Sequence, residues 1–119
     1  MTADEAMAAA EGYVRGVAEQ DRAGLRALFA GTATISGLDE GNWVDVPRDR
    51  WIDFVCAPER KGAGAAESRI RSVTLEESVA TVVVETVFGG FRYHDILLVG
   101  AHPDGPRILC KAFHQFAAA

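Results

Sequence analysis

The sequence contains few cysteines and no long apolar run. Cys56 and Cys110 are its only two cysteines, and neither lies in a CxxC pair or at a metal-ligand interval from a histidine. The N-terminal residues are acidic, whereas a secretory signal peptide begins with basic residues. Two cysteines without a secretory signal predict reduced thiols and a cytoplasmic protein. No apolar run approaches the ~20 residues that a membrane-spanning helix needs. We therefore expect no metal site and no membrane segment.

Basic residues are also scarce relative to acidic ones. The formal net charge is −5, and no dense stripe of lysine and arginine is present. The most basic segment, residues 48–61, has acidic residues interleaved with its basic ones, which is typical of a solvated surface. A surface of this charge repels nucleic acid and anionic membranes on average, so neither is an expected partner.

Several motifs that carry enzyme chemistry are missing. The sequence has no Walker loop, no GxSxG, no HExxH and no dinucleotide fingerprint. Phosphoryl, acyl and hydride transfer therefore lack their usual residues, and we expect no cofactor.

The strongest structural signal is a β-hairpin over residues 79–99. Two β-branched and aromatic runs, 79–88 and 91–99, flank Gly89-Gly90, which suits a primed two-residue turn because glycine adopts positive φ at both positions. If Phe88 pairs with Phe91, Val84 lies opposite Asp95. Side chains alternate between the faces of a strand, so this register also decides which residues share a face.

Both faces of this hairpin are largely apolar, whereas one face of an antiparallel sheet is usually polar. We expect helices to cover the inner face and a second copy of the chain to cover the outer face, giving a homodimer. The residues of the outer face are predicted to be Val83, Glu85, Val87, His94, Ile96 and Leu98.

The rest of the chain predicts a single α+β domain over residues 1–119. A capping box at Thr2 and Glu5 begins a helix over 3–19. Asp21 caps a second short helix that Gly31 closes, and a third helix follows Pro47. A sheet that curls over three N-terminal helices forms a cone, whose mouth commonly holds a small ligand. The remaining strands are predicted at 32–36, 43–44, 67–75 and 107–116.

Four short motifs carry a resemblance to a known family. They are Tyr13 with Gln20-Asp21, Tyr93-His-Asp95-Ile-Leu97-Leu-Val99, Asp104-Gly105, and Lys111-Ala-Phe113-His114. The chain resembles the nuclear transport factor 2-like superfamily of ketosteroid isomerases, scytalone dehydratase and SnoaL-like cyclases, and within it the putative lumazine-binding family. The sequence departs from the family pattern at Gln20, which replaces a glycine, and at Pro106, near the usual tryptophan. The resemblance implies a cone-shaped, cystatin-like fold with a strongly curved mixed or antiparallel sheet, and a dimer.

We expect the cone to bind a small apolar or aromatic molecule. Trp43 follows a polar loop and is the candidate wall or lid, whereas Trp51 and Phe54 are assigned to the core. The predicted pocket residues are Tyr13, Trp43, Thr86, Tyr93, Asp95, Lys111 and Phe113.

Asp95 has two interpretations. In the structural one, it forms a cross-strand ion pair with Lys111 inside the cone. In the catalytic one, Asp95 is a general base and Tyr93 is its acid or hydrogen-bond partner. On the other face, Glu85, His94 and His114 lie close together, and we interpret them as hydrogen-bonding residues of an interface rather than metal ligands.

Three functions remain open from the sequence. The first is a small-molecule-binding domain with no established reaction. The second is an acid–base isomerase, dehydratase or cyclase with Asp95 and Tyr93 as catalytic residues. The third is a non-catalytic interaction module whose cone is filled by its own side chains. An open cavity with Asp95 and Tyr93 exposed to it favours the first two.

Overall fold

The computed structural model describes residues 1–118, and for residues 117 and 118 only the backbone. Three α-helices and one short 3₁₀-helix are present: α1 (Ala3–Glu19), α2 (Arg22–Leu28), α3 (Arg48–Val55) and η1 (Pro58–Arg60). The strands are β1 (Phe29–Asp39), β2 (Asn42–Pro47), β3 (Gly64–Glu76), β4 (Val79–Phe88), β5 (Phe91–Gly100) and β6 (Arg107–Ala118). No helix within residues 1–118 has the length and apolar character needed to cross a membrane.

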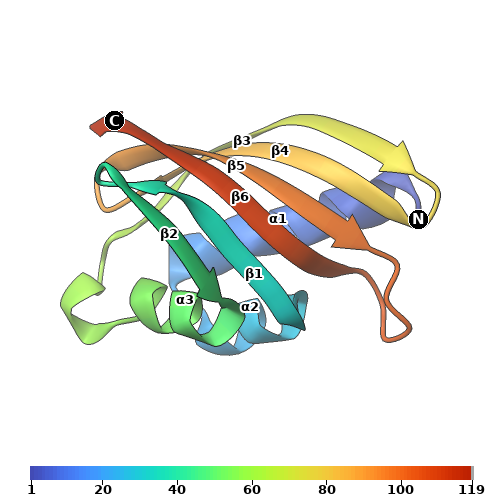
Figure 1. The fold of residues 1–119 in the computed structure, drawn as a ribbon, viewed down its shortest axis with the longest axis horizontal. Coiled ribbons are helices and arrows are strands. Elements are labelled where there is room, and N and C mark those ends of the chain that lie inside the picture. Colours follow the sequence, from blue (N-terminus) through green and yellow to red (C-terminus); the bar gives the residue numbers. More distant parts are fainter. Residues whose placement is uncertain (119) are drawn as a thin grey trace.

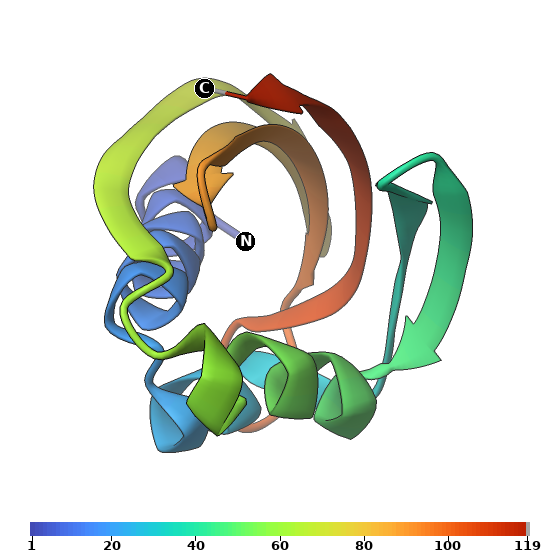
Figure 2. The same ribbon diagram turned by 90° about the vertical axis from the view of Figure 1, so that its left-hand side faces the viewer.

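The six strands form one strongly curved sheet in the order β2-β1-β6-β5-β4-β3. β1 and β6 run parallel, and all other neighbours are antiparallel, so the sheet is mixed. Figure 1 shows the long strands lying over α1, and Figure 2 shows the curled sheet with α2 and α3 below it. The predicted α+β cone over three helices is confirmed.

The central hairpin has the predicted register. Gly89 and Gly90 have φ of 60° and 81°, and Phe88 pairs with Phe91 across the turn. Val84 therefore pairs with Asp95, and both side chains are fully buried on the concave face. The register places a carboxylate in the middle of an apolar wall.

Both ends of α1 are held by side-chain hydrogen bonds. Thr2 and Glu5 form the expected capping box at its start. At its end Gln20 has a φ of 51°, in the left-handed region where glycine is preferred. Its side chain donates to the carbonyls of Val55 and Arg60, each at 2.8 Å, and accepts from the Gly62 amide at 3.0 Å. These bonds fix the segment after α3 against the end of α1.

The segment after α2 differs from the prediction. The helix ends at Leu28, and Gly31 lies inside β1 instead of closing the helix. From Thr34 onward β1 pairs with β2 on one side and β6 on the other, and this double pairing holds Gly37 in a strand despite its low β-propensity. Gly31 lies in the irregular part of β1 between Phe29 and Thr34. β1 therefore extends to Asp39, beyond the predicted 32–36.

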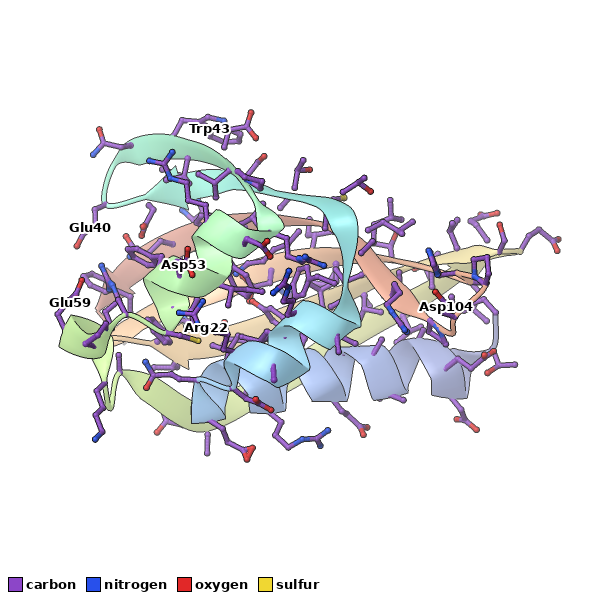
Figure 3. All side chains as sticks on the ribbon, turned by 90° about the horizontal axis from the view of Figure 1, so that it is seen from below. Arg22, Glu40, Trp43, Asp53, Glu59 and Asp104 are labelled. Carbon is purple, nitrogen blue, oxygen red and sulfur yellow. The ribbon has the colours of Figure 1, made fainter. Side chains whose placement is uncertain are left out.

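The concave face and the helices enclose the core. Tyr13 of α1, Phe29 of β1 and Trp51 of α3 pack with ring centroids 5.1 to 6.2 Å apart. Arg22 and Asp53 form an ion pair that joins α2 to α3 (Figure 3). Tyr13 and Trp51 of the aromatic cluster form one side of the site described next.

Candidate ligand-binding site

A cavity of about 150 Å³ lies between the concave face of the sheet and α3. It is lined mainly by valines and aromatic side chains from α1, β2, α3, β4, β5 and β6, with four polar residues among them. The polar residues are Asp39, Arg50, Thr86 and Lys111. Phe54, which is 40% exposed, and Arg50 lie where the cavity meets the surface.

The structure brings most of the predicted pocket residues together. The cavity is lined by Tyr13, Thr86, Tyr93, Lys111 and Phe113. Asp95 is fully buried next to this wall and contacts three of its residues without lining the cavity itself.

Trp43 is not at the cavity. Its side chain is 70% exposed and projects from the molecule at β2 (Figure 3). Val44 and Val46 of the same strand line the cavity, and alternation along the strand directs Trp43 to the opposite side. The prediction of Trp43 as a wall or lid did not take this parity into account.

Some lining residues were assigned elsewhere from the sequence. Trp51 is buried in the core, as predicted, and also contributes to the cavity wall. Phe54 was placed in the core as well, but it is an exposed residue at the edge of the cavity. Asp39 was placed in a loop, but it ends β1 on the side that faces the cavity. Ala33 and Ile35 are buried on the same face of β1. If the strand had been predicted to continue to residue 39, the alternation of faces would have placed Asp39 on this buried face too.

Asp95 is held by two hydroxyl donors. Its Oδ2 accepts hydrogen bonds from Tyr13 Oη and Thr86 Oγ1, each at 2.8 Å. Burial, and next the charge of Asp95, raise the pKa of Tyr13 well above its usual value, so the phenol remains a donor. Asp95 Oδ1 has no hydrogen-bond partner among the described residues.

Lys111 brings a cation into this apolar environment. Its Nζ lies 3.9 Å from Asp95 Oδ1, and the side chain is 7% exposed. The register pairs Lys111 with Leu97 and Phe113 with Asp95, so the ion pair is diagonal across β5 and β6. Burial lowers the pKa of Lys111, and the charges of Asp95 and Asp39 partly offset this effect.

Tyr93 and Asp39 supply further hydrogen-bonding atoms. Tyr93 Oη accepts a bond from Gln115 Nε2 at 3.0 Å, which leaves its own proton for another acceptor. Burial raises the pKa of Tyr93 to about 12. Asp39 Oδ1 is buried and has no hydrogen-bond partner within residues 1–118. The cavity thus combines flat apolar walls with a few donors and acceptors.

The second predicted cluster lies on the convex face. His94 Nε2 lies 3.0 Å from Glu85 Oε1. The rings of His94 and His114 pack on the ring of Phe116, with centroid distances of 4.4 and 4.6 Å. In the part of the chain that the structure describes, no three or more histidine, cysteine or acidic residues are grouped to hold a metal ion.

The sequence was compared with known families and proteins. The family model described as putative lumazine-binding matches residues 2–114. The chain belongs to this family. A search of curated proteins found no match.

Solved structures of the same fold come from several bacteria. An NTF-2 like protein of unknown function from Silicibacter pomeroyi DSS-3 is 29% identical, with a TM-score of 0.83, and the match covers 98% of this chain and 100% of that one. An NTF2-like protein of unknown function from Shewanella baltica OS155 is 19% identical, with a TM-score of 0.81 and 99% of each chain covered. A ketosteroid isomerase-like protein from Erwinia carotovora atroseptica SCRI1043 is 16% identical, with a TM-score of 0.74 and 98% and 99% covered. This chain therefore has the NTF2-like fold.

Proposed function

We propose that the cavity binds a small, flat and largely apolar molecule. The observation that carries this proposal is the cavity itself, with a volume of about 150 Å³ between aromatic and valine side chains. A cavity of about 150 Å³ holds a molecule the size of one benzene ring. The name of the family points in the same direction, toward a small aromatic ligand.

The volume also limits the ligand. Drug-sized ligands occupy sites of roughly 300 to 1,000 Å³. A bicyclic molecule such as a lumazine therefore needs Phe54 and Arg50 to move outward, and both are exposed enough to do so. Single-ring compounds fit the cavity as it stands.

Two observations favour binding over the other two functions. Asp95 does not line the cavity and its Oδ2 already accepts two hydrogen bonds, whereas a general base must reach the proton that it removes. A cone filled by its own side chains would leave no such cavity. The acid–base enzyme and the interaction module are therefore the weaker hypotheses.

Tryptophan fluorescence tests the proposal because the two tryptophans differ in position. In a Trp43→Phe variant the remaining Trp51 lines the cavity, and in a Trp51→Phe variant the remaining Trp43 is solvent-exposed. Titration with benzyl alcohol is expected to change the Trp51 emission saturably and to leave the Trp43 emission unchanged. Equal responses in both variants, or no response in either, would contradict the proposal.

We further propose that the chain forms a homodimer through the convex face of the sheet. Ile96 is 47% exposed there and lies between its register partners Val83 and Ala112. Figure 2 shows the helices on the concave side, and within the described residues Ile96 and Ala112 are exposed and Val83 is half-buried. A second copy would bury the apolar strip formed by these three residues, and Glu85 and His94, which contact each other on the same face, would lie in the interface.

Light scattering at micromolar concentration tests this dimer. The native chain is expected to be dimeric and Ile96→Asp monomeric. Leu75→Asp is the matched control, because Leu75 on β3 is 41% exposed but lies away from the strip. A monomeric native chain would contradict the proposal.

A cytoplasmic location also stays a prediction, supported by Cys56 and Cys110, which are both free thiols.

A further inference from the structure

Lys111 occupies a site that a lysine rarely occupies. Only 6% of its surface is exposed, and the side chain lines the cavity. Its Nζ lies 4.4 Å from the ring centroid of Trp51 and 5.2 Å from those of Tyr13 and Phe113. Lysine is almost never this buried unless it is paired. An amine surrounded by aromatic rings at a cavity wall therefore needs an explanation.

The ion pair with Asp95 does not provide a full one. The separation of 3.9 Å is too long for a hydrogen bond, and Oδ1 of Asp95 has no hydrogen-bond partner among residues 1–118. The other oxygen of Asp95 is fixed by Tyr13 and Thr86, which turns Oδ1 toward the amine. A proton acceptor thus stands next to the lysine, although the two groups are not tightly bonded.

We propose that Lys111 Nζ forms a reversible imine with a small aromatic aldehyde or ketone held in the cavity. This inference rests on the proposed function, because the carbonyl compound must first enter the same cavity. It assigns to the site a covalent chemistry that binding alone does not require.

The step balances with the groups present. A small movement of the lysine side chain closes the 3.9 Å gap to hydrogen-bond reach, and Lys111 then gives one ammonium proton to Asp95 Oδ1. The lone pair that this leaves on Nζ bonds to the carbonyl carbon. The carbonyl oxygen takes the two remaining nitrogen protons and leaves as water, so that C=N replaces C=O. The proton on Asp95 then returns to the imine nitrogen. No oxidant, reductant or further reactant is needed.

The environment favours this reaction at neutral pH. Burial lowers the pKa of Lys111, and a desolvated lysine in an apolar pocket is a known route to an amine nucleophile. The aromatic walls hold a flat carbonyl compound, and the protonated imine keeps the positive charge next to the Asp95 carboxylate. The iminium therefore replaces the ammonium without leaving a buried charge unpaired.

Reductive trapping of the native chain tests the inference. The chain has only one other lysine, Lys61, which is exposed in the segment after η1 and serves as an internal control. The protein is incubated at pH 7 with benzaldehyde and sodium cyanoborohydride, and the benzylated sites are quantified by peptide mass spectrometry. Because the cavity holds the aldehyde next to the amine and burial lowers the pKa of Lys111, we expect Lys111 to be labelled several-fold more than Lys61.

Two variants and one inert probe complete the experiment. Lys111→Arg keeps the charge and is expected to lose the main adduct, whereas Lys61→Arg is expected to keep it. Benzyl alcohol has the same ring but no carbonyl group, so it reports on cavity binding alone. If benzyl alcohol binds but Lys111 is labelled no faster than Lys61, the imine inference is overturned and the proposed function stands. If benzyl alcohol does not bind and Lys111 is not labelled, both are overturned.

Discussion

Replacing Tyr13 by phenylalanine removes one hydroxyl from the centre of the site. The ring keeps its packing on Phe29 and Trp51, but Asp95 Oδ2 loses the donor at 2.8 Å and retains only Thr86. A hydrogen bond to a charged group contributes about 1.5 to 3 kcal/mol, and Asp95 is fully buried, so water cannot replace the lost donor. We expect Tyr13→Phe to lower the free energy of unfolding by about 2 kcal/mol.

Tyr93→Phe is the matched control, because it also removes one phenol hydroxyl from the cavity wall. Tyr93 Oη accepts a neutral bond from Gln115 and is half-buried, so its loss is expected to cost about 1 kcal/mol or less. Urea unfolding followed by far-ultraviolet circular dichroism measures both variants. If Tyr13→Phe costs less than about 0.5 kcal/mol, or no more than Tyr93→Phe, the hydroxyl does not stabilise the buried carboxylate as argued.

Thr86→Val extends the same test to the second donor on that oxygen. Combined with Tyr13→Phe, it leaves Asp95 Oδ2 with neither hydroxyl donor. The double variant should therefore lose more stability than the two single variants added together, by about 0.5 kcal/mol or more. Strict additivity would mean that the two bonds act independently.

Three further predictions follow from other parts of the structure. Tyr13 and Tyr93 are the only tyrosines, and burial raises the pKa of both, that of Tyr93 to about 12. The folded chain should therefore show almost no phenolate absorbance at 295 nm near pH 10, unlike the chain unfolded in guanidinium. The free energy of unfolding should fall as the pH rises from about 10, because only the unfolded chain then loses its phenol protons. A native titration midpoint near 10 would refute this. Gln20→Ala should destabilise the chain by about 1 to 3 kcal/mol in urea unfolding, since it removes three hydrogen bonds to backbone groups. Gln20→Gly should recover part of that loss, because glycine adopts the positive φ of this position without strain. A glycine variant less stable than the alanine variant would contradict the role of φ. Gly37→Ala should cost about 1 to 3 kcal/mol, because its Cβ would clash with the Phe113 carbonyl oxygen. Gly31→Ala, with its nearest contact at 3.7 Å, should change the stability little, and equal melting temperatures for the two variants would argue against this packing.

Much of the sheet could be predicted because its signals are local. The Gly89-Gly90 turn fixes the register of β4 and β5, and strand alternation then places Val84 and Asp95 on the same buried face. The start of α1 was equally predictable from its capping box. These features depend on neighbouring residues and not on the rest of the fold.

The rest depended on contacts between distant segments. The length of β1 follows from its pairing with β6, which lies at the other end of the sequence. The hydrogen bond between Tyr13 and Asp95 spans 82 residues, and no local pattern indicates it. The error at Trp43 has the same origin, since the face that β2 turns to the cavity is decided by its pairing with β1.

Intermolecular nuclear Overhauser effects with benzyl alcohol test the central claim most directly. The methyl groups of Val17, Val46 and Val55 line the cavity from three different elements, whereas those of Leu75 and Ile96 lie on the surface. We predict effects from the ligand ring to the three valines together and none to the two surface residues. Effects to Leu75 or Ile96 alone, or none to the valines at saturating ligand, would contradict a ligand site within the cone.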